Sequence, residues 1–228
     1  MKSIKDLDHL QKSLLFAKLS QLAYNNIDVA KKQAKVLGFT TTEFYDKDGA
    51  QAYRFMSKAN LVIACRGTQP TEFNDLKADL KALPVLAETV SRVHRGFKAE
   101  VDELWPMIKE DIDRKANLKK ELWFCGHSLG AAMATIMSSR AKFDGALNDP
   151  IELFDIVTTV PPAFLGFKHH GTENYLNAYG LIRTPTGWQL FKDKWRGIWM
   201  GLKQGKIDSF SDHSIDEYIK HIESALAK

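Results

Sequence analysis

The sequence predicts an α/β fold with a mainly parallel central sheet flanked by helices. Short apolar runs alternate along the chain with amphipathic stretches at helical spacing, as in strands connected by helices. The run at 61–65 is continuously apolar, which is typical of a strand buried on both faces. A second strand, at 121–125, stops at the Gly-x-Ser-x-Gly segment 126–130, and an alanine-rich helix follows. The other candidate site residues are identified relative to this strand, turn and helix around Ser128.

Composition limits the classes of protein that this chain can belong to. Its 228 residues, 44% apolar and 26% charged, predict one soluble globular domain over 1–228. A formal net charge of +4, with both signs interspersed, does not indicate a nucleic-acid partner. We expect no transmembrane segment, because no run approaches 18 uncharged apolar residues. The N-terminus shows no signal peptide, so we expect a cytoplasmic or non-classically exported protein.

The two cysteines are expected to be buried free thiols. Cys65 and Cys125 each lie inside an apolar strand, and neither has the spacing of a zinc ligand. Free thiols fit a reducing compartment.

The other elements follow in chain order. Helices are expected over 4–22, 28–37, 93–117, 129–142 and 188–203 and from about 214 to the C-terminus; strands over 40–45, 52–56 and 151–154; and two hairpin-like stretches at 175–179 and 181–184. The amphipathic stretch 71–86 is either a short mobile helix over a site or an ordinary surface helix. Similarly, the basic and aromatic helix at 188–203 either lies on an anionic lipid surface or packs its aromatic face on the core.

The turn at 126–130 predicts a catalytic nucleophile. Flanking glycines let the backbone reverse sharply, which exposes the Ser128 hydroxyl at the end of the sheet. The turn also directs backbone N–H groups and the positive end of the following helix toward the atom that this oxygen attacks. A glycine-rich structural turn is the alternative, but the strand before it and the helix after it favour the nucleophile.

A serine nucleophile needs a base and an acid that orients the base. Among the seven histidines, His213 is the candidate base, because it lies far along the chain in a loop before a helix. Where a serine is presented on such a turn, the chain order is serine, aspartate, histidine. Asp155 is the candidate acid, since it follows the strand at 151–154. Asp212 adjoins His213 too closely to orient its ring easily.

Two backbone donors are expected to form an oxyanion hole. The N–H of Leu129 directly follows the nucleophile. The N–H of Thr68, after the strand at 61–65, is the second donor, and its hydroxyl can add another.

With these residues in place, the chain resembles the class 3 (fungal-lipase-like) lipases, which have the α/β-hydrolase fold. The matching motifs, in chain order, are Arg66-Gly67-Thr68, Val93-His94-Arg95-Gly96-Phe97, Gly126-His127-Ser128-Leu129-Gly130, Asp155-Ile156-Val157 with Val160-Pro161-Pro162, and Asp212-His213-Ser214 with Tyr218. The resemblance implies a triad of Ser128, Asp155 and His213, and an oxyanion hole of Thr68 and Leu129. It also implies a lid over about 69–90 and neither a metal nor an organic cofactor.

One segment departs from the family pattern. Asp155 follows Ser128 by only 27 positions, and no Phe-Gly-x-Pro-Arg-type turn lies between them. One helix and one strand fill this span, so the sheet is expected to be one strand shorter than in the family, with Asp155 one position closer to the turn.

The resemblance implies a serine carboxylester hydrolase, and a triacylglycerol lipase or esterase is the first expectation. A phospholipase A1 or a feruloyl or short-chain esterase would use the same triad. A non-catalytic, lipase-like binding module would result if the short segment misplaces Asp155. The expected partners are a lipid or other carboxylester substrate and a lipid interface in peripheral contact.

Overall fold

The computed structural model describes residues 3–67, 84–86, 92–127, 129–145, 152–155, 175–176, 182–183 and 215–227. The chain forms two compact units, Met1–Thr172 and Glu173–Lys228. The first unit contains the central sheet, and the second contains a short hairpin and the C-terminal helix. The single domain expected over 1–228 stays a prediction.

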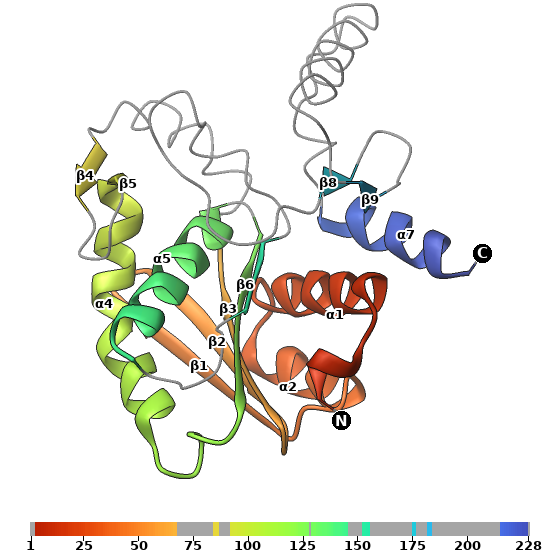
Figure 1. Cartoon of the computed structure of the whole chain (residues 1–228), viewed down its shortest axis with the longest axis horizontal. Helices are drawn as coiled ribbons and strands as arrows, with labels where there is room; N and C mark the ends of the chain where they lie inside the picture. Colours follow the sequence, from red (N-terminus) through yellow and green to blue (C-terminus); the bar gives the residue numbers. More distant parts are fainter. Residues whose placement is uncertain are drawn as a thin grey trace, which may run out of the picture. The chain divides into compact units, whose positions relative to one another are not determined.

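A five-stranded mixed sheet forms the centre of the first unit (Figure 1). Its strands lie in the order β1 (Thr41–Lys47), β2 (Ala50–Met56), β3 (Asn60–Cys65), β6 (Glu121–Gly126) and β7 (Glu152–Asp155). β6 pairs parallel with both β3 and β7, as expected, whereas β2 pairs antiparallel with both β1 and β3. The antiparallel part follows from short connections, because a parallel pair needs a long crossover.

The connection between β1 and β2 is a tight turn of two residues. Asp48 and Gly49 have φ angles of 50° and 89°, the left-handed values that a type I′ hairpin turn requires. Glycine and aspartate tolerate this region better than most residues. The sequence predicted this hairpin, but both strands extend closer to the turn than expected.

Two helices begin where side chains cap them. The N-terminal helix expected over 4–22 divides into a 3-10 turn, Ile4–Asp6, and α1, His9–Leu22. The division occurs at Asp8, which caps the start of α1. Its carboxylate accepts the N–H of Gln11 at 2.8 Å, and the Gln11 side chain accepts the N–H of Asp8 at 3.1 Å. Helix α2, Ile27–Val36, follows Asn26, which caps it in the same way.

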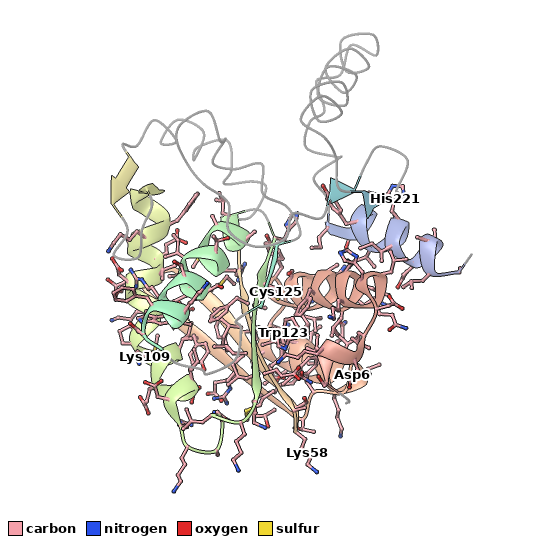
Figure 2. All side chains as sticks on the ribbon, in the orientation of Figure 1. Asp6, Lys58, Lys109, Trp123, Cys125 and His221 are labelled. Atoms are coloured by element: carbon pink, nitrogen blue, oxygen red, sulfur yellow. The ribbon has the colours of Figure 1, made fainter. Side chains whose placement is uncertain are left out.

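Side chains alternate between the two faces of the sheet and form two apolar clusters. Helices α1 and α2 cover one face, and α4 (Arg95–Asp113) and α5 (Leu129–Phe143) cover the other (Figure 1). Trp123 and Cys125 of β6 pack with α1, as Figure 2 shows, whereas Leu122 and Phe124 pack with α4 and α5. Successive side chains of a strand point to opposite faces of the sheet, and both faces are covered by apolar side chains. The strand sequences are therefore continuous hydrophobic runs.

The two thiols are free and buried, as predicted. Cys65 belongs to the cluster under α4 and α5, and Cys125 belongs to the cluster under α1 and α2. Because these clusters lie on opposite faces of the sheet, the two sulfurs cannot form a disulfide with each other.

The long helix before β6 is shorter than the sequence predicted. Val93 and His94 belong to β5 (Arg92–His94), which pairs antiparallel with β4 (Pro84–Leu86). The helix ends at Asp113 and not near Asn117, whose side chain instead donates a hydrogen bond to the carbonyl of Asp111 at 2.7 Å. Such a bond satisfies one of the carbonyls that a helix end leaves without a partner.

In the second unit, β8 (Tyr175–Leu176) pairs antiparallel with β9 (Ile182–Arg183). The two predicted hairpin-like stretches are therefore the two strands of one hairpin. The expected C-terminal helix is confirmed as α7, Ile215–Leu226. The helix expected over 188–203 lies outside the described residues. Within the described part of the chain, no helix has the length and apolar character needed to cross a membrane.

Replacement of Asp102 by asparagine tests the main ionic contact between α4 and α5. The Asp102 carboxylate accepts hydrogen bonds from the buried Arg140 guanidinium and, at 2.9 Å, from Lys98 Nζ. Burial by itself would raise the pKa of Asp102, but the hydrogen bonds from Arg140 and Lys98 outweigh it and lower that pKa. We expect Asp102→Asn to lower the free energy of unfolding by about 1 kcal/mol at neutral pH, since Asp102 is partly exposed to water.

The pH dependence of this loss follows from the lowered pKa. A carboxyl whose pKa is lower in the folded state stabilises the fold above its unfolded pKa, and this stabilisation disappears as the pH falls through the folded pKa. Urea unfolding at neutral and acidic pH should therefore show a difference between Asp102→Asn and the parent that vanishes in acid. Asp113→Asn is the control, since Asp113 pairs with the solvent-accessible Lys109 and Asp102 pairs with the buried Arg140. A difference that persists unchanged in acid would contradict the ionic role of Asp102.

Candidate active site

The predicted nucleophile turn lies where β6 meets α5. Strand β6 ends at Gly126 and α5 begins at Leu129, so only His127 and Ser128 connect them. Ser128 itself lies outside the described residues, but both of its neighbours are described. The N–H of Gly130 donates to the carbonyl of His127 at 3.1 Å, which closes the chain into a turn around position 128. This is the strand–turn–helix geometry that the Gly-x-Ser-x-Gly segment predicts.

Three glycines allow the close packing of this turn. A Cβ on Gly126 would overlap the backbone of Gly130, and a Cβ on Gly130 would overlap the carbonyl oxygen of Cys65. A Cβ on Gly67 would lie 2.7 Å from the carbonyl oxygen of His127. The ends of β3 and β6 and the start of α5 therefore approach one another more closely than any residue with a side chain permits.

Gly130→Ala is expected to damage both stability and turnover. The new methyl group would overlap the backbone of Cys65, so the end of β3 and the start of α5 must separate. We expect a loss of about 1–3 kcal/mol in the free energy of unfolding, as in overpacked cores. Because the movement displaces the N–H of Leu129, turnover per active site should fall at least about 10-fold.

Thermal melts and the turnover number per titrated active site check this prediction. Gly49→Ala is the matched control: a Cβ there meets nothing within 4 Å, but the φ of 89° strains any other residue. Gly49→Ala should therefore lower stability and leave turnover unchanged. Parental stability and turnover in Gly130→Ala would show that the turn tolerates a side chain.

The two predicted oxyanion donors belong to adjacent parts of this edge. Strands β3 and β6 are parallel neighbours with Cys65 opposite Gly126, so both end at the same edge of the sheet. Leu129 is the first residue of α5 and is buried. Thr68 lies outside the described residues, one position after Gly67. Of the two predicted donors, the structure therefore describes Leu129 only, together with Gly67, the residue before Thr68.

Arg66 ties the end of β3 to β2. Its N–H donates to the carbonyl of Gln51 at 3.0 Å, and its guanidinium donates to the Gln51 side chain. These two bonds restrain the backbone that leads to Thr68.

The strand of the predicted acid lies directly beside the nucleophile strand. β7 pairs with β6, and the Cα of Asp155 is opposite the Cα of Gly126. The backbone of Asp155 is thus at the same edge as the turn, with no strand between β6 and β7 in the described sheet. This is the arrangement that the short span between Ser128 and Asp155 predicted. The Asp155 side chain lies outside what the structure describes.

The predicted base belongs to the second unit. His213 lies outside the described residues, two positions before α7 begins at Ile215. Of the predicted lid over 69–90, only β4 at Pro84–Leu86 is described. Among the residues whose side chains are described, no group of three or more histidines, cysteines and carboxylates could hold a metal ion.

Neither thiol near the turn is a competing nucleophile. Burial raises the pKa of Cys125 to about 12. Burial also raises the pKa of Cys65 well above its usual range. A thiol reacts as its thiolate, so both sulfurs stay protonated and inert near neutral pH.

Tyr24, just after α1, also contacts the turn. Its hydroxyl lies 3.2 Å from Nδ1 of His127, and the two rings meet edge to face with centroids 6.1 Å apart. His127 is buried. Sequence reasoning missed Tyr24, because no motif connects a residue at position 24 with one at position 127.

Comparisons with known proteins find one matching family model and several solved structures of similar fold. The model of the family described as lipase (class 3) matches residues 62–166. A triacylglyceride lipase from Rhizomucor miehei superposes with a TM-score of 0.59 at 18% identity, covering 73% of this chain and 80% of that one. A triacylglycerol lipase whose catalytic centre is a serine protease triad gives a TM-score of 0.62 at 19% identity, covering 76% and 82%. Lipase II from Rhizopus niveus gives 0.54 at 19% identity, covering 71% and 78%.

No curated protein matches the chain. The structural likenesses confirm the α/β-hydrolase fold, in which helices flank a central sheet and a nucleophile turn follows one of its middle strands.

Proposed function

We propose that this chain is a serine ester hydrolase of the class 3 lipase family and that it hydrolyses acylglycerol esters with Ser128 as the nucleophile. The proposal rests on the match of the class 3 lipase model to residues 62–166. Two of the enzymes that share its fold are described as triacylglyceride or triacylglycerol lipases. The substrate class is therefore proposed by family and by fold. The identity of the nucleophile is proposed from the turn at 126–130.

The observation that most supports this proposal is the glycine-packed turn between β6 and α5. It brings the first N–H groups of α5 beside the loop after β3, at the carboxyl ends of the parallel strands β3 and β6. Helix N-termini and their free N–H groups stabilise a developing oxyanion. A purely structural turn has no need for three glycines whose backbones approach so closely.

In the proposed mechanism, Oγ of Ser128 attacks the acyl carbonyl carbon while His213 accepts the hydroxyl proton. Asp155 holds the imidazole of His213 in the required tautomer and stabilises its charge. The N–H groups of Leu129 and Thr68 donate to the oxyanion. His213 then protonates the departing alcohol as the ester bond breaks, which leaves an acyl group on Ser128. Water activated by the same base releases the acid and restores the serine.

A non-catalytic, lipase-like binding module is the second candidate. The observation that favours it is the short span from Ser128 to Asp155, which leaves β7 directly beside β6. If this arrangement directs the Asp155 carboxylate away from His213, the base loses its orienting partner.

Labelling with a fluorophosphonate separates the two candidates. This probe phosphonylates a serine only when a base activates it, so an active enzyme should be labelled and the adduct should map to Ser128 by peptide mass. Heat-unfolded protein is the control for non-specific reaction. Absence of labelling in folded protein would contradict the enzyme and favour the binding module. For labelled protein, hydrolysis rates across p-nitrophenyl esters of increasing chain length would distinguish a lipase from a short-chain esterase.

A further inference from the structure

We infer that Tyr24 is a positioning residue that holds together the two loops supplying the oxyanion hole. This inference rests on the proposed function, since it assigns a role within the same site. Tyr24 belongs neither to the predicted triad nor to the predicted oxyanion pair. It reaches the site from a different part of the chain, just after the C-terminal end of α1.

The hydroxyl of Tyr24 contacts the nucleophile turn at two points. It lies 3.2 Å from Nδ1 of His127, and it lies 3.4 Å from the carbonyl oxygen of the same residue. The edge-to-face contact between the two rings adds to these polar contacts. His127 directly precedes Ser128 and lies two residues before Leu129, so its position constrains the first predicted oxyanion donor.

The same hydroxyl also contacts the loop after β3. The backbone N–H of Gly67 hydrogen bonds to Tyr24, and a Cβ added to Gly67 would come within 2.7 Å of the Tyr24 oxygen. Gly67 directly precedes Thr68, the second predicted donor. One hydroxyl group therefore joins the residue before Thr68 to the residue before Ser128.

A tyrosine hydroxyl suits this position because it can accept and donate at the same time. Its oxygen accepts the N–H of Gly67, while its proton is available to Nδ1 or to the carbonyl oxygen of His127. Burial raises the pKa of Tyr24 to about 12, so the proton is retained throughout the neutral range. The backbone of Tyr24 is itself restrained, since its N–H donates to the carbonyl of Gln21 at 3.1 Å.

The contact matters because two donors must hold a fixed spacing to bind one oxyanion. A displacement of about 1 Å in a catalytic group can cost about 100-fold in rate. Loss of the single hydroxyl that bridges the two loops should displace the donors by less than about 1 Å, so the rate should fall by less than about 100-fold.

Tyr24→Phe tests the inference, because it keeps the ring and removes only the hydroxyl. We expect kcat per titrated active site to fall about 10-fold, with KM changed less than about two-fold. Inactivation by a p-nitrophenyl phosphonate should slow by a similar factor, because its tetrahedral adduct also places an oxygen in the oxyanion hole. A purely structural role would lower the fraction of active sites that can be titrated and leave kcat per site unchanged.

Tyr53→Phe is the matched control. The Tyr53 hydroxyl donates to the carbonyl of Asn25, the residue after Tyr24, at 2.8 Å, and not to a described residue of the nucleophile turn. Both variants lose a tyrosine hydrogen bond at the end of α1, so similar losses of thermal stability are expected. Only Tyr24→Phe should lower kcat.

The outcomes distinguish this inference from the proposed function. If the parent protein is not labelled by a fluorophosphonate, the proposed function fails and the role of Tyr24 fails with it. If the parent is active and Tyr24→Phe keeps kcat within two-fold, only the role of Tyr24 is overturned. An equal loss of kcat in Tyr53→Phe would also overturn it, because the effect would then come from stability at the end of α1.

Discussion

Ser128→Ala is expected to reduce ester hydrolysis by about 10⁶-fold, the loss typical of removing a serine nucleophile from a triad. The substitution deletes the only atom that forms the acyl-enzyme, so the two-step reaction cannot begin. Residual hydrolysis above that in water can still come from substrate binding and from the oxyanion donors. The measurement is steady-state hydrolysis of a p-nitrophenyl ester, with loss of fluorophosphonate labelling as a second readout.

Ser139→Ala is the control for this variant. Ser139 lies in α5, the helix that begins just after Ser128, at a position only partly exposed to solvent. It should keep both turnover and labelling. Undiminished hydrolysis by Ser128→Ala would refute the proposed mechanism outright.

Asp155→Asn is expected to reduce turnover by about 10⁴-fold, because an amide cannot hold the base in the productive tautomer or stabilise its positive charge. The prediction depends on the register of β7, which places the backbone of Asp155 opposite Gly126 at the edge where the nucleophile turn lies. Since the substitution keeps the size of the side chain, the fold should be retained. Fluorophosphonate labelling should slow in parallel with turnover.

Glu152→Gln is the matched control, because Glu152 lies at the start of the same short strand, opposite Trp123. It loses one carboxylate from β7 but none from the edge near the turn. Nearly normal turnover in Asp155→Asn would show that another carboxylate orients the base. Asp212, beside His213, would then be the first residue to substitute.

Much of the architecture could be predicted from the sequence, since its strands and helices have distinct periods. The apolar run at 61–65 and the strand at 121–125 became β3 and β6, and the residue alternation within them matches the two faces of the sheet. The turn at 126–130 was recognisable because glycine is required wherever backbones approach this closely. Local chemistry of this kind is visible in a single stretch of chain.

Other features could not be predicted, because they depend on contacts between distant residues. The assignment of Val93 to a strand and not to α4 comes from its pairing with Val85. The division of the N-terminal helix at Asp8 was visible in principle as a capping box, but helical spacing continues on both sides of it. The two hairpin-like stretches were recognised as extended, but only pairing shows that β8 and β9 are partners.

The sequence by itself determined the fold class, the nucleophile turn and the resemblance to one lipase family, because glycine positions, hydrophobic period and motif order are properties of the chain. Only the tertiary structure decided which strand adjoins β6 and which side chain lies against the turn. β7 pairs directly with β6, and Tyr24 contacts His127 and Gly67 from a position just after α1, more than 40 residues before Gly67. Such neighbours are selected by the packing of α1 against the sheet. No spacing along the sequence records that packing.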